Sequence, residues 1–198
     1  DPVRFIGNQS SGKMGYAVAN QAAEWGAEVV LVSGPTDNLT LHPEIRLVPV
    51  TTADQMHKEC LTYYKDSDVV VMAAAVADFK PKNPKKSKIK KSVSLETLSL
   101  EPTVDILNDL GAKKNKQFLV GFALETEEGL DYARQKMTRK NLDAIVLNSL
   151  ADHGAGFGHD TNKITFIKSD GSHNAYPLKS KKEVALDLLH EINLLINE

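Results

Sequence analysis

Residues 69–91 read VVVMAAAVADFKPKNPKKSKIKK, and this stretch decides the fold that the sequence predicts. An apolar run without polar alternation passes through small residues to Asp78 and then into a loop rich in lysine and proline. Continuous apolar runs are typical of strands covered on both faces of a parallel sheet. Because open α/β sheets bind ligands just beyond the carboxyl ends of their strands, the run predicts a buried central strand with a binding site near Asp78.

The segments around this stretch alternate between strand and helix patterns. Strands are predicted at residues 28–33, 45–50, 117–123 and 143–148. A helix that follows the glycine-rich loop of residues 7–15 is predicted to end at Gly26, and further helices are predicted at residues 53–65, 103–112 and 127–140. Thr52 and Gln55 match a capping box at the head of the helix that follows them. The alternation predicts an α/β fold with a Rossmann-like, doubly wound, mainly parallel sheet.

After residue 150 the pattern changes. Residues 163–168 and 174–177 predict a hairpin around Asp170-Gly171, and Ser180 with Glu183 predicts a capped closing helix. Residues 92–100 alternate like a hairpin arm outside the main sheet. We expect one domain over residues 1–198, with a nucleotide-binding core at 1–150 and a hairpin and closing helix at 151–198.

Composition narrows the classes of partner. The formal net charge of −2 gives no global basic field for nucleic acid, and one cysteine permits no internal disulfide. No apolar run is long enough to span a bilayer, so the sequence predicts a cytoplasmic protein with neither nucleic acid nor membrane as partner. The six histidines and Cys60 lack metal-ligand spacing, and no metal ligands are assigned.

A glycine-rich loop precedes the first predicted helix. Gly7 and Gly12-Lys13 have the spacing of a P-loop, but Met14 stands where Ser or Thr would hold magnesium. Ser10, Ser11 and Gly12 still leave backbone N–H groups at a helix start, which favour a phosphate. An ordinary serine-rich helix start is the alternative.

Two groups of lysines have open interpretations. The lysines of residues 80–91 form either a solvated loop or a flap that brings a cation to a transferring phosphoryl group. Lys136 and Lys140 share a helix face and form either a phosphate clamp or a solvated surface. Tyr132 and Lys136 also have the Tyr-x-x-x-Lys spacing of short-chain dehydrogenases.

Several blocks together resemble the phosphopantothenoylcysteine synthetase family. They are DPVRFIGNQSSGKMG at residues 1–15, AAAVADF at 73–79 and KIKK at 88–91, followed by VGFA at 120–123 and KNLD at 140–143. Blocks in this order are more specific than any one of them. In bacteria this domain is usually fused to a flavin-dependent phosphopantothenoylcysteine decarboxylase.

The resemblance implies a ligase that joins 4′-phosphopantothenate to L-cysteine through an acyl-nucleotide intermediate. CTP is favoured over ATP as the activating nucleotide, with Mg²⁺ and without a flavin in this domain. The family also implies a homodimer, formed through the hairpin at residues 163–177 or the arm at 92–100. A nearby or fused decarboxylase is the expected further partner.

Site residues follow from the resemblance by position. Asn8 and Lys88 match the residues associated with the acyl phosphate and with forming the intermediate. The expected nucleotide site comprises Ser10, Ser11, Gly12, Ala73, Ala74, Asp78, Val104, Asp105, Ile106, Leu107, Phe122, Lys136 and Lys140. The family's first strand and its glycine-threonine turn are missing from this chain, and Val104 replaces a family proline.

Two other functions fit parts of the pattern. An NAD(P)-dependent oxidoreductase of short-chain type would use Tyr132 and Lys136. A non-catalytic nucleotide-binding domain would use the same glycine-rich loop without the ligase chemistry.

Overall fold

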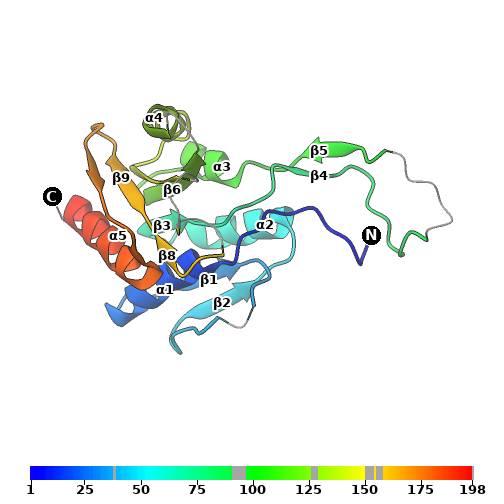
Figure 1. Ribbon diagram of the computed structural model, residues 1–198, viewed down its shortest axis with the longest axis horizontal. Coiled ribbons are helices and arrows are strands. Elements are labelled where there is room, and N and C mark those ends of the chain that lie inside the picture. The colour runs from blue at the N-terminus through cyan, green and yellow to red at the C-terminus, as the bar shows by residue number, and fades with distance from the viewer. Residues whose placement is uncertain (38, 91–96, 126–128, 150–153, 155–157, 198) are drawn as a thin grey trace.

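The computed structural model describes the chain except for residues 38, 91–96, 126–128, 150–153, 155–157 and 198 (Figure 1). Its helices are α1 (Lys13–Glu24), α2 (Ala53–Tyr64), α3 (Ile106–Ala112), α4 (Gly129–Arg139) and α5 (Lys181–Ile196). Its strands are β1 (Val30–Ser33), β2 (Arg46–Pro49), β3 (Val69–Met72), β4 (Phe79–Pro81), β5 (Leu100–Pro102), β6 (Phe118–Glu125), β7 (Ala144–Ser149), β8 (Thr161–Asn162), β9 (Ile164–Lys168), β10 (His173–Ala175) and β11 (Lys179–Ser180). All the predicted helices are therefore present.

The main sheet has five strands in the order β10-β9-β7-β6-β3. The strands β3, β6 and β7 are parallel, as the predicted alternation of strands and helices requires. The strands β9 and β10 run antiparallel, so the predicted C-terminal hairpin continues the main sheet. The predicted fold class is confirmed.

Helices cover both faces of this sheet (Figure 1). On β6, Leu119 packs with α2, α3 and α4 on one face, while Val120 packs with α1 and α5 on the other. Neighbouring residues alternate between the two clusters because strand side chains point to opposite faces. No helix in the described part of the chain is long and apolar enough to cross a membrane.

The strands β1 and β2 pair in parallel with each other and are separate from the main sheet. In the described chain β3 is hydrogen-bonded to β6 alone, and β1 and β3 line the same cavity. The prediction that residues 69–72 are a buried central strand is therefore wrong: Val69 is exposed, and the next three residues are half-buried, because β3 is an edge strand.

Local sequence signals are confirmed where they concern helix starts. Both halves of the capping box are present at Thr52 and Gln55, and again at Ser180 and Glu183. Each box satisfies backbone N–H groups that the first helical turn leaves unpaired. These boxes fix where α2 and α5 begin.

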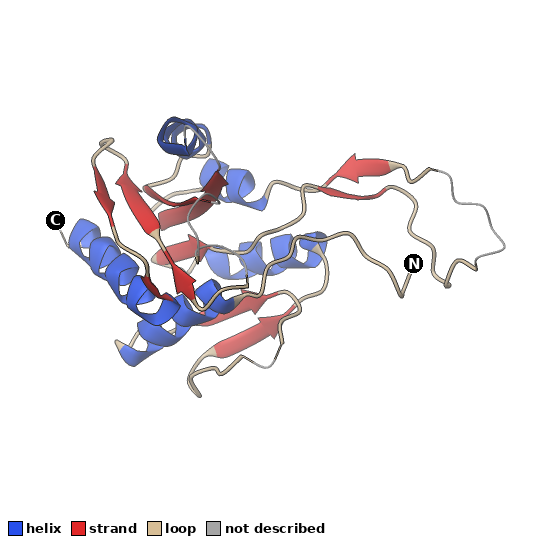
Figure 2. Cartoon of the chain, viewed as in Figure 1, coloured by secondary structure: helices blue, strands red, loops and turns tan. Residues whose placement is uncertain are grey.

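A projecting arm follows β3 (Figure 2). The strands β4 and β5 pair antiparallel outside the main sheet. The prediction placed this hairpin arm at residues 92–100, of which 92–96 lie outside the described residues. Residues 79–81, which were predicted as loop, supply the other strand of the arm because they pair with Leu100–Pro102.

Candidate functional site

A large cavity of about 2220 Å³ runs along β1 and β3, from Asp66 before β3 to the residues beyond its carboxyl end. It is lined by the glycine-rich loop, by the residues that follow β3, by the start of the arm and by the β6 residue Phe122. Predicted site residues among its lining are Asn8, Ser10, Ser11, Gly12, Ala73, Ala74, Asp78, Phe122 and Lys136. Segments distant in sequence thus meet where the carboxyl-end rule predicts a ligand.

Asn8 joins the glycine-rich loop to the end of β3. Its side-chain Nδ2 donates to the backbone carbonyl of Ala75 at 3.2 Å and lies 3.3 Å from that of Val76. On the other side, Thr103 Oγ1 donates to the carbonyl of Ala77 at 2.6 Å. The segment leading to Asp78 is therefore held from both sides.

The glycine-rich loop enters α1 through Gly12. Gly12 has a φ of 73°, and a Cβ atom there would lie 2.5 Å from Thr36 Cγ2, so both backbone and space require glycine. The α1 N-cap has no side-chain hydrogen bond to the first helical turn. The N–H groups of that turn lack a side-chain cap beside the cavity, the arrangement that favours an anion.

Lys136 and Lys140 lie near each other at the end of α4. Lys136 Nζ donates to the carbonyl of Phe122 at 2.9 Å, and Lys140 Nζ donates to Asp105 Oδ1 at 2.9 Å. Burial lowers the pKa of Lys136, and the Lys140 ammonium lowers it further. The charged form of Lys136 is thus disfavoured until an anion approaches.

Asp105 caps α3 and faces the same lysines. Its Oδ1 accepts from the backbone N–H of Asn108 at 3.0 Å. Burial acts to raise the pKa of Asp105, but the hydrogen bonds from Lys140 and Asn108 outweigh it and lower the pKa. Asp105 and Lys140 do not line the large cavity, and they act on Lys136, which does, through their charges.

Some predicted residues lie elsewhere. Lys88 is exposed and does not line the cavity, whereas Lys82, Lys85 and Lys86 of the same run do. Val104 is exposed. The side chains of Ile106 and Leu107 pack in the core beneath α3, so their backbone is what remains for a ligand.

Sequence reasoning missed Asn148 and Thr103 as cavity residues. Asn148 ends a predicted strand, so the carboxyl-end rule that selected Asp78 also applies to it. Its Oδ1 accepts from the buried Asn162 Nδ2 at 3.3 Å. Among the described residues, no group of three or more His, Cys, Asp or Glu side chains could hold a metal ion.

Comparison with known families matches residues 1–195 to the model of the DNA/pantothenate metabolism flavoprotein C-terminal domain. The chain belongs to this family. A member in Bacillus subtilis, the coenzyme A biosynthesis bifunctional protein CoaBC, is 47% identical over 195 residues, covering 98% of this chain and 48% of that protein.

A second family relative bears a different name. A cysteine/cysteine sulfinic acid decarboxylase from an unknown prokaryotic organism is 47% identical over 201 residues, covering 100% of this chain and 55% of that protein. The chain therefore spans about half the length of these curated relatives.

Two solved structures share the fold of this chain. The crystal structure of the C-terminal domain of a coenzyme A biosynthesis bifunctional protein CoaBC has a TM-score of 0.83 and 42% identity, covering all of this chain and 89% of that one. A Cab2 mutant in complex with phosphopantothenate-cysteine has a TM-score of 0.75 and 19% identity, covering 98% of this chain and 82% of that one. At that identity the likeness concerns the fold.

Proposed function

We propose that this chain is a phosphopantothenate–cysteine ligase that forms 4′-phosphopantothenoyl-L-cysteine in coenzyme A biosynthesis. Membership of the family and the bifunctional coenzyme A relatives support the assignment. The observation that carries it is the meeting of the glycine-rich loop with the end of β3, through Asn8 and Ala75, at one large cavity. Such a cavity has room for a nucleotide and a second phosphorylated ligand.

The reaction must activate a carboxylate, because an unactivated carboxylate does not acylate an amine. A carboxylate oxygen of 4′-phosphopantothenate attacks the α-phosphorus of the nucleoside triphosphate, and pyrophosphate leaves. The cysteine amine then attacks the acyl carbon, the nucleoside monophosphate leaves, and the amine loses a proton. Both steps develop negative charge on oxygen atoms, which fixed N–H donors and cations stabilise.

We assign the charge-stabilising roles to two residues. The Asn8 amide, 3.2 Å from the Ala75 carbonyl, is held at the end of β3 and donates to the developing oxyanion. Lys88 is carried by the loop beyond β4 and approaches the nucleotide phosphates when the ligands are bound. The backbone of Ser10, Ser11 and Gly12 supplies further N–H donors at the start of α1.

The nucleotide is CTP in this proposal, with ATP as the alternative. Mg²⁺ accompanies it and is held mainly by phosphate oxygens and water, so one carboxylate suffices on the protein. Asp78 is the carboxylate at the carboxyl end of β3, where it serves either the cation or the base. Lys136, whose charged form is disfavoured by burial, gains stability when a phosphate approaches.

The partners are also proposed from the family. A flavin-dependent decarboxylase would act on the product, and we assign the decarboxylase name of one relative to the part that this chain does not cover. A homodimer would form through the β9–β10 hairpin, since β10 is exposed and its outer edge has no partner strand in the described chain.

The dehydrogenase alternative receives less support from the geometry. Tyr132 is 55% exposed on α4 and does not line the cavity that Lys136 lines. A tyrosine and lysine that act on one substrate must reach the same site. A non-catalytic nucleotide-binding domain would bind the same nucleotide, so only a measurement of catalytic turnover distinguishes it from the ligase.

A thermal-shift panel of CTP, ATP and NADPH, each with Mg²⁺, tests this proposal. A ligand at 100 times its Kd stabilises the folded state by about 2.7 kcal/mol. We expect CTP to raise the melting temperature most, and 4′-phosphopantothenate to raise it further. Stabilisation by NADPH alone would contradict the ligase assignment.

A further inference from the structure

The segment that carries Lys88 leaves β4 and runs beyond the arm towards the N-terminus (Figure 1). We call its described residues 82–90 the flap. Near its far end Lys88 is exposed, but Ile89 is half-buried. An apolar residue between two lysines predicts a docking point, and the contacts of Ile89 show what it docks on.

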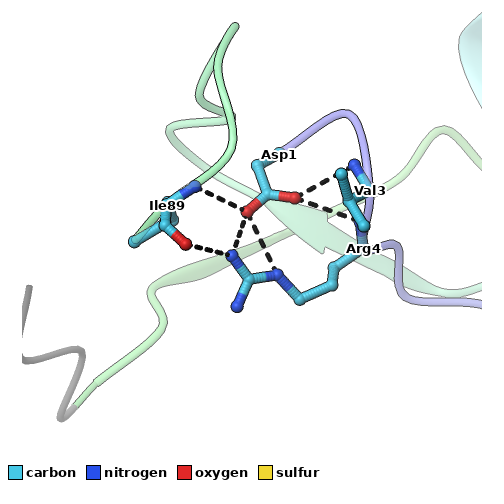
Figure 3. Close-up of polar contacts among 4 residues, drawn as sticks. All are labelled: Asp1, Val3, Arg4 and Ile89. Carbon is cyan, nitrogen blue, oxygen red and sulfur yellow. Dashed lines mark hydrogen bonds and ion pairs between the residues drawn. The ribbon is translucent and has the colours of Figure 1, made fainter. Parts of the chain in front are cut away.

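Both backbone polar groups of Ile89 contact the N-terminal segment (Figure 3). The Ile89 N–H donates to Asp1 Oδ2 at 3.1 Å, and Arg4 Nη2 donates to the Ile89 carbonyl at 3.0 Å. Two hydrogen bonds to one residue fix the direction of its peptide groups. The chain direction at the adjacent Lys88 is fixed with them.

The Asp1 carboxylate accepts hydrogen bonds from the N-terminal segment as well as from Ile89. Its side chain is 0% exposed, and it accepts from the backbone N–H groups of Val3 at 3.0 Å and Arg4 at 3.1 Å. Arg4 Nε donates to it at 3.1 Å, and Arg4 Nη2 forms a second bond to Asp1 Oδ2. Charge-assisted bonds of this kind are about twice as strong as neutral ones.

The same short segment also holds the other predicted catalytic residue. Asn8 follows Arg4 by four positions, and four steps of extended chain span at most about 14 Å. Arg4 contacts the flap, and Asn8 contacts Ala75 at the end of β3. The base of the arm is anchored as well, where Lys80 Nζ donates to Asp54 Oδ2 at 2.7 Å.

We propose that Asp1 and Arg4 are positioning residues, which clip the backbone of Ile89 and so anchor the far end of the flap, the position from which Lys88 moves to the nucleotide in the first step of the reaction. The inference rests on the proposed ligase function. The clip comprises Asp1, Arg4 and the Ile89 backbone. It acts through Lys88 and touches neither substrate nor nucleotide.

The test uses Asp1→Ala, Arg4→Ala and the double variant. Lys116→Ala is the control for Arg4→Ala, because Lys116 is about as exposed as Arg4 and pairs with Asp68 at 3.1 Å, at the opposite ends of β3 and β6. Amide hydrogen exchange over residues 82–90 reports the clip without catalysis. Pyrophosphate release in the absence of cysteine reports the first step.

We expect faster exchange at the flap in both single variants, with unchanged melting temperatures. We also expect pyrophosphate release to slow by about tenfold to a hundredfold at saturating nucleotide, since small misplacements of a catalytic group have effects of that size. The nucleotide KM should change little. The double variant should be no slower than the slower single variant, because the two residues act as one unit.

Three other results would contradict different parts of this proposal. Unchanged flap exchange in either single variant contradicts the clip. Faster exchange with an unchanged rate contradicts its positioning role. A wild type that releases no pyrophosphate with either nucleotide overturns the proposed function, and the exchange result then still decides whether the clip exists.

Discussion

The side-chain amide of Asn8 lies 3.2 Å from the backbone carbonyl of Ala75 and donates a hydrogen bond to it, across 67 residues of sequence. The glycine-rich loop and the end of β3 are thereby joined at one cavity. Asn8→Asp replaces this donor with a carboxylate, which repels both the carbonyl and a developing oxyanion. We expect the intermediate to form and its conversion by cysteine to slow by about a hundredfold.

Rapid-quench measurement of nucleoside monophosphate released after cysteine addition checks this expectation. Asn20→Asp is a suitable control, since Asn20 Nδ2 donates to the carbonyl of Thr40 at 3.0 Å and Asn20 does not line the large cavity. Conversion at the wild-type rate in Asn8→Asp would remove Asn8 from the mechanism.

Lys88→Gln is expected to block the first step. The substitution keeps the length and polarity of the side chain but removes the cation that the developing phosphate charge needs. Loss of one such charge typically reduces the rate by about a hundredfold to a thousandfold. Pyrophosphate release without cysteine measures the effect, with Lys90→Gln as the neighbouring control; an unchanged rate for Lys88→Gln would count against its role.

Lys136→Met should separate stability from nucleotide binding. Because the pKa of Lys136 is lowered in the folded protein, folding disfavours its charged form. The free energy of unfolding therefore rises with pH between the lowered pKa and the ordinary lysine pKa. Removing the charge should leave the melting temperature within about 2 °C of wild type. Nucleotide affinity should fall by about tenfold, the effect of one lost charged hydrogen bond.

Lys114→Met is the matched control for this lysine. Lys114 is also largely buried and pairs with Asp143 at 2.9 Å, but it lies at the opposite ends of the strands. We expect it to lower stability and leave nucleotide affinity unchanged. Calorimetric titration of CTP into both variants makes the comparison, and wild-type affinity in Lys136→Met would refute a role in the site.

Gly111→Ala should destabilise the fold. A Cβ atom at Gly111 would lie 1.9 Å from the Lys140 carbonyl oxygen, so α3 and the end of α4 must separate. We expect a loss of about 1–3 kcal/mol in the free energy of unfolding, as overpacking usually produces. Urea unfolding tests this against Gly34→Ala, where no atom lies within 4 Å; equal stability of the two variants would contradict the packing.

Glu191→Gln should reduce stability in a pH-dependent way. Burial acts to raise the pKa of Glu191, but hydrogen bonds from Tyr176, Asn174 and Lys168 outweigh it and lower the pKa. A lowered folded-state pKa contributes stability that is present above the unfolded pKa and is lost as the pH falls through the folded one. The variant should lose about 1–3 kcal/mol at pH 7.

Urea unfolding of Glu191→Gln and of the wild type at neutral and acid pH measures how much the Glu191 carboxylate contributes to the free energy of unfolding. The difference from wild type should shrink as the pH falls below about 4, near the usual glutamate pKa. Glu24→Gln is the control, since Glu24 is exposed and forms an exposed pair with Lys182 at 3.5 Å. If the difference in the free energy of unfolding stays constant with pH, the lost stability comes from packing and not from the charge of Glu191.

Local signals in the sequence predicted the fold well. The capping boxes at Thr52 and Ser180 fixed two helix starts, because their hydrogen bonds lie within four residues. The strand at Val69–Met72 was also predicted, but its burial was not. Burial depends on a neighbouring strand, and β3 has none on its outer side in the described chain.

Long-range contacts account for what the sequence left open. The cavity around Asp78 was predicted from strand ends, whereas the Arg4–Ile89 hydrogen bond joins residues 85 apart and has no local signature. The sequence resemblance selected Lys88, but the structure has Lys82, Lys85 and Lys86 at the cavity instead. Side-chain positions on a loop depend on ligands and contacts that a pattern does not encode.

The most direct test of ligase activity is an assay of the protein with 4′-phosphopantothenate, CTP and Mg²⁺, before and after cysteine is added. Ligase activity predicts pyrophosphate release that depends on 4′-phosphopantothenate, followed by formation of 4′-phosphopantothenoyl-L-cysteine and CMP when cysteine is present. ATP is assayed in parallel to decide the nucleotide. Nucleotide binding without pyrophosphate release from either nucleotide would contradict ligase activity and favour a non-catalytic domain.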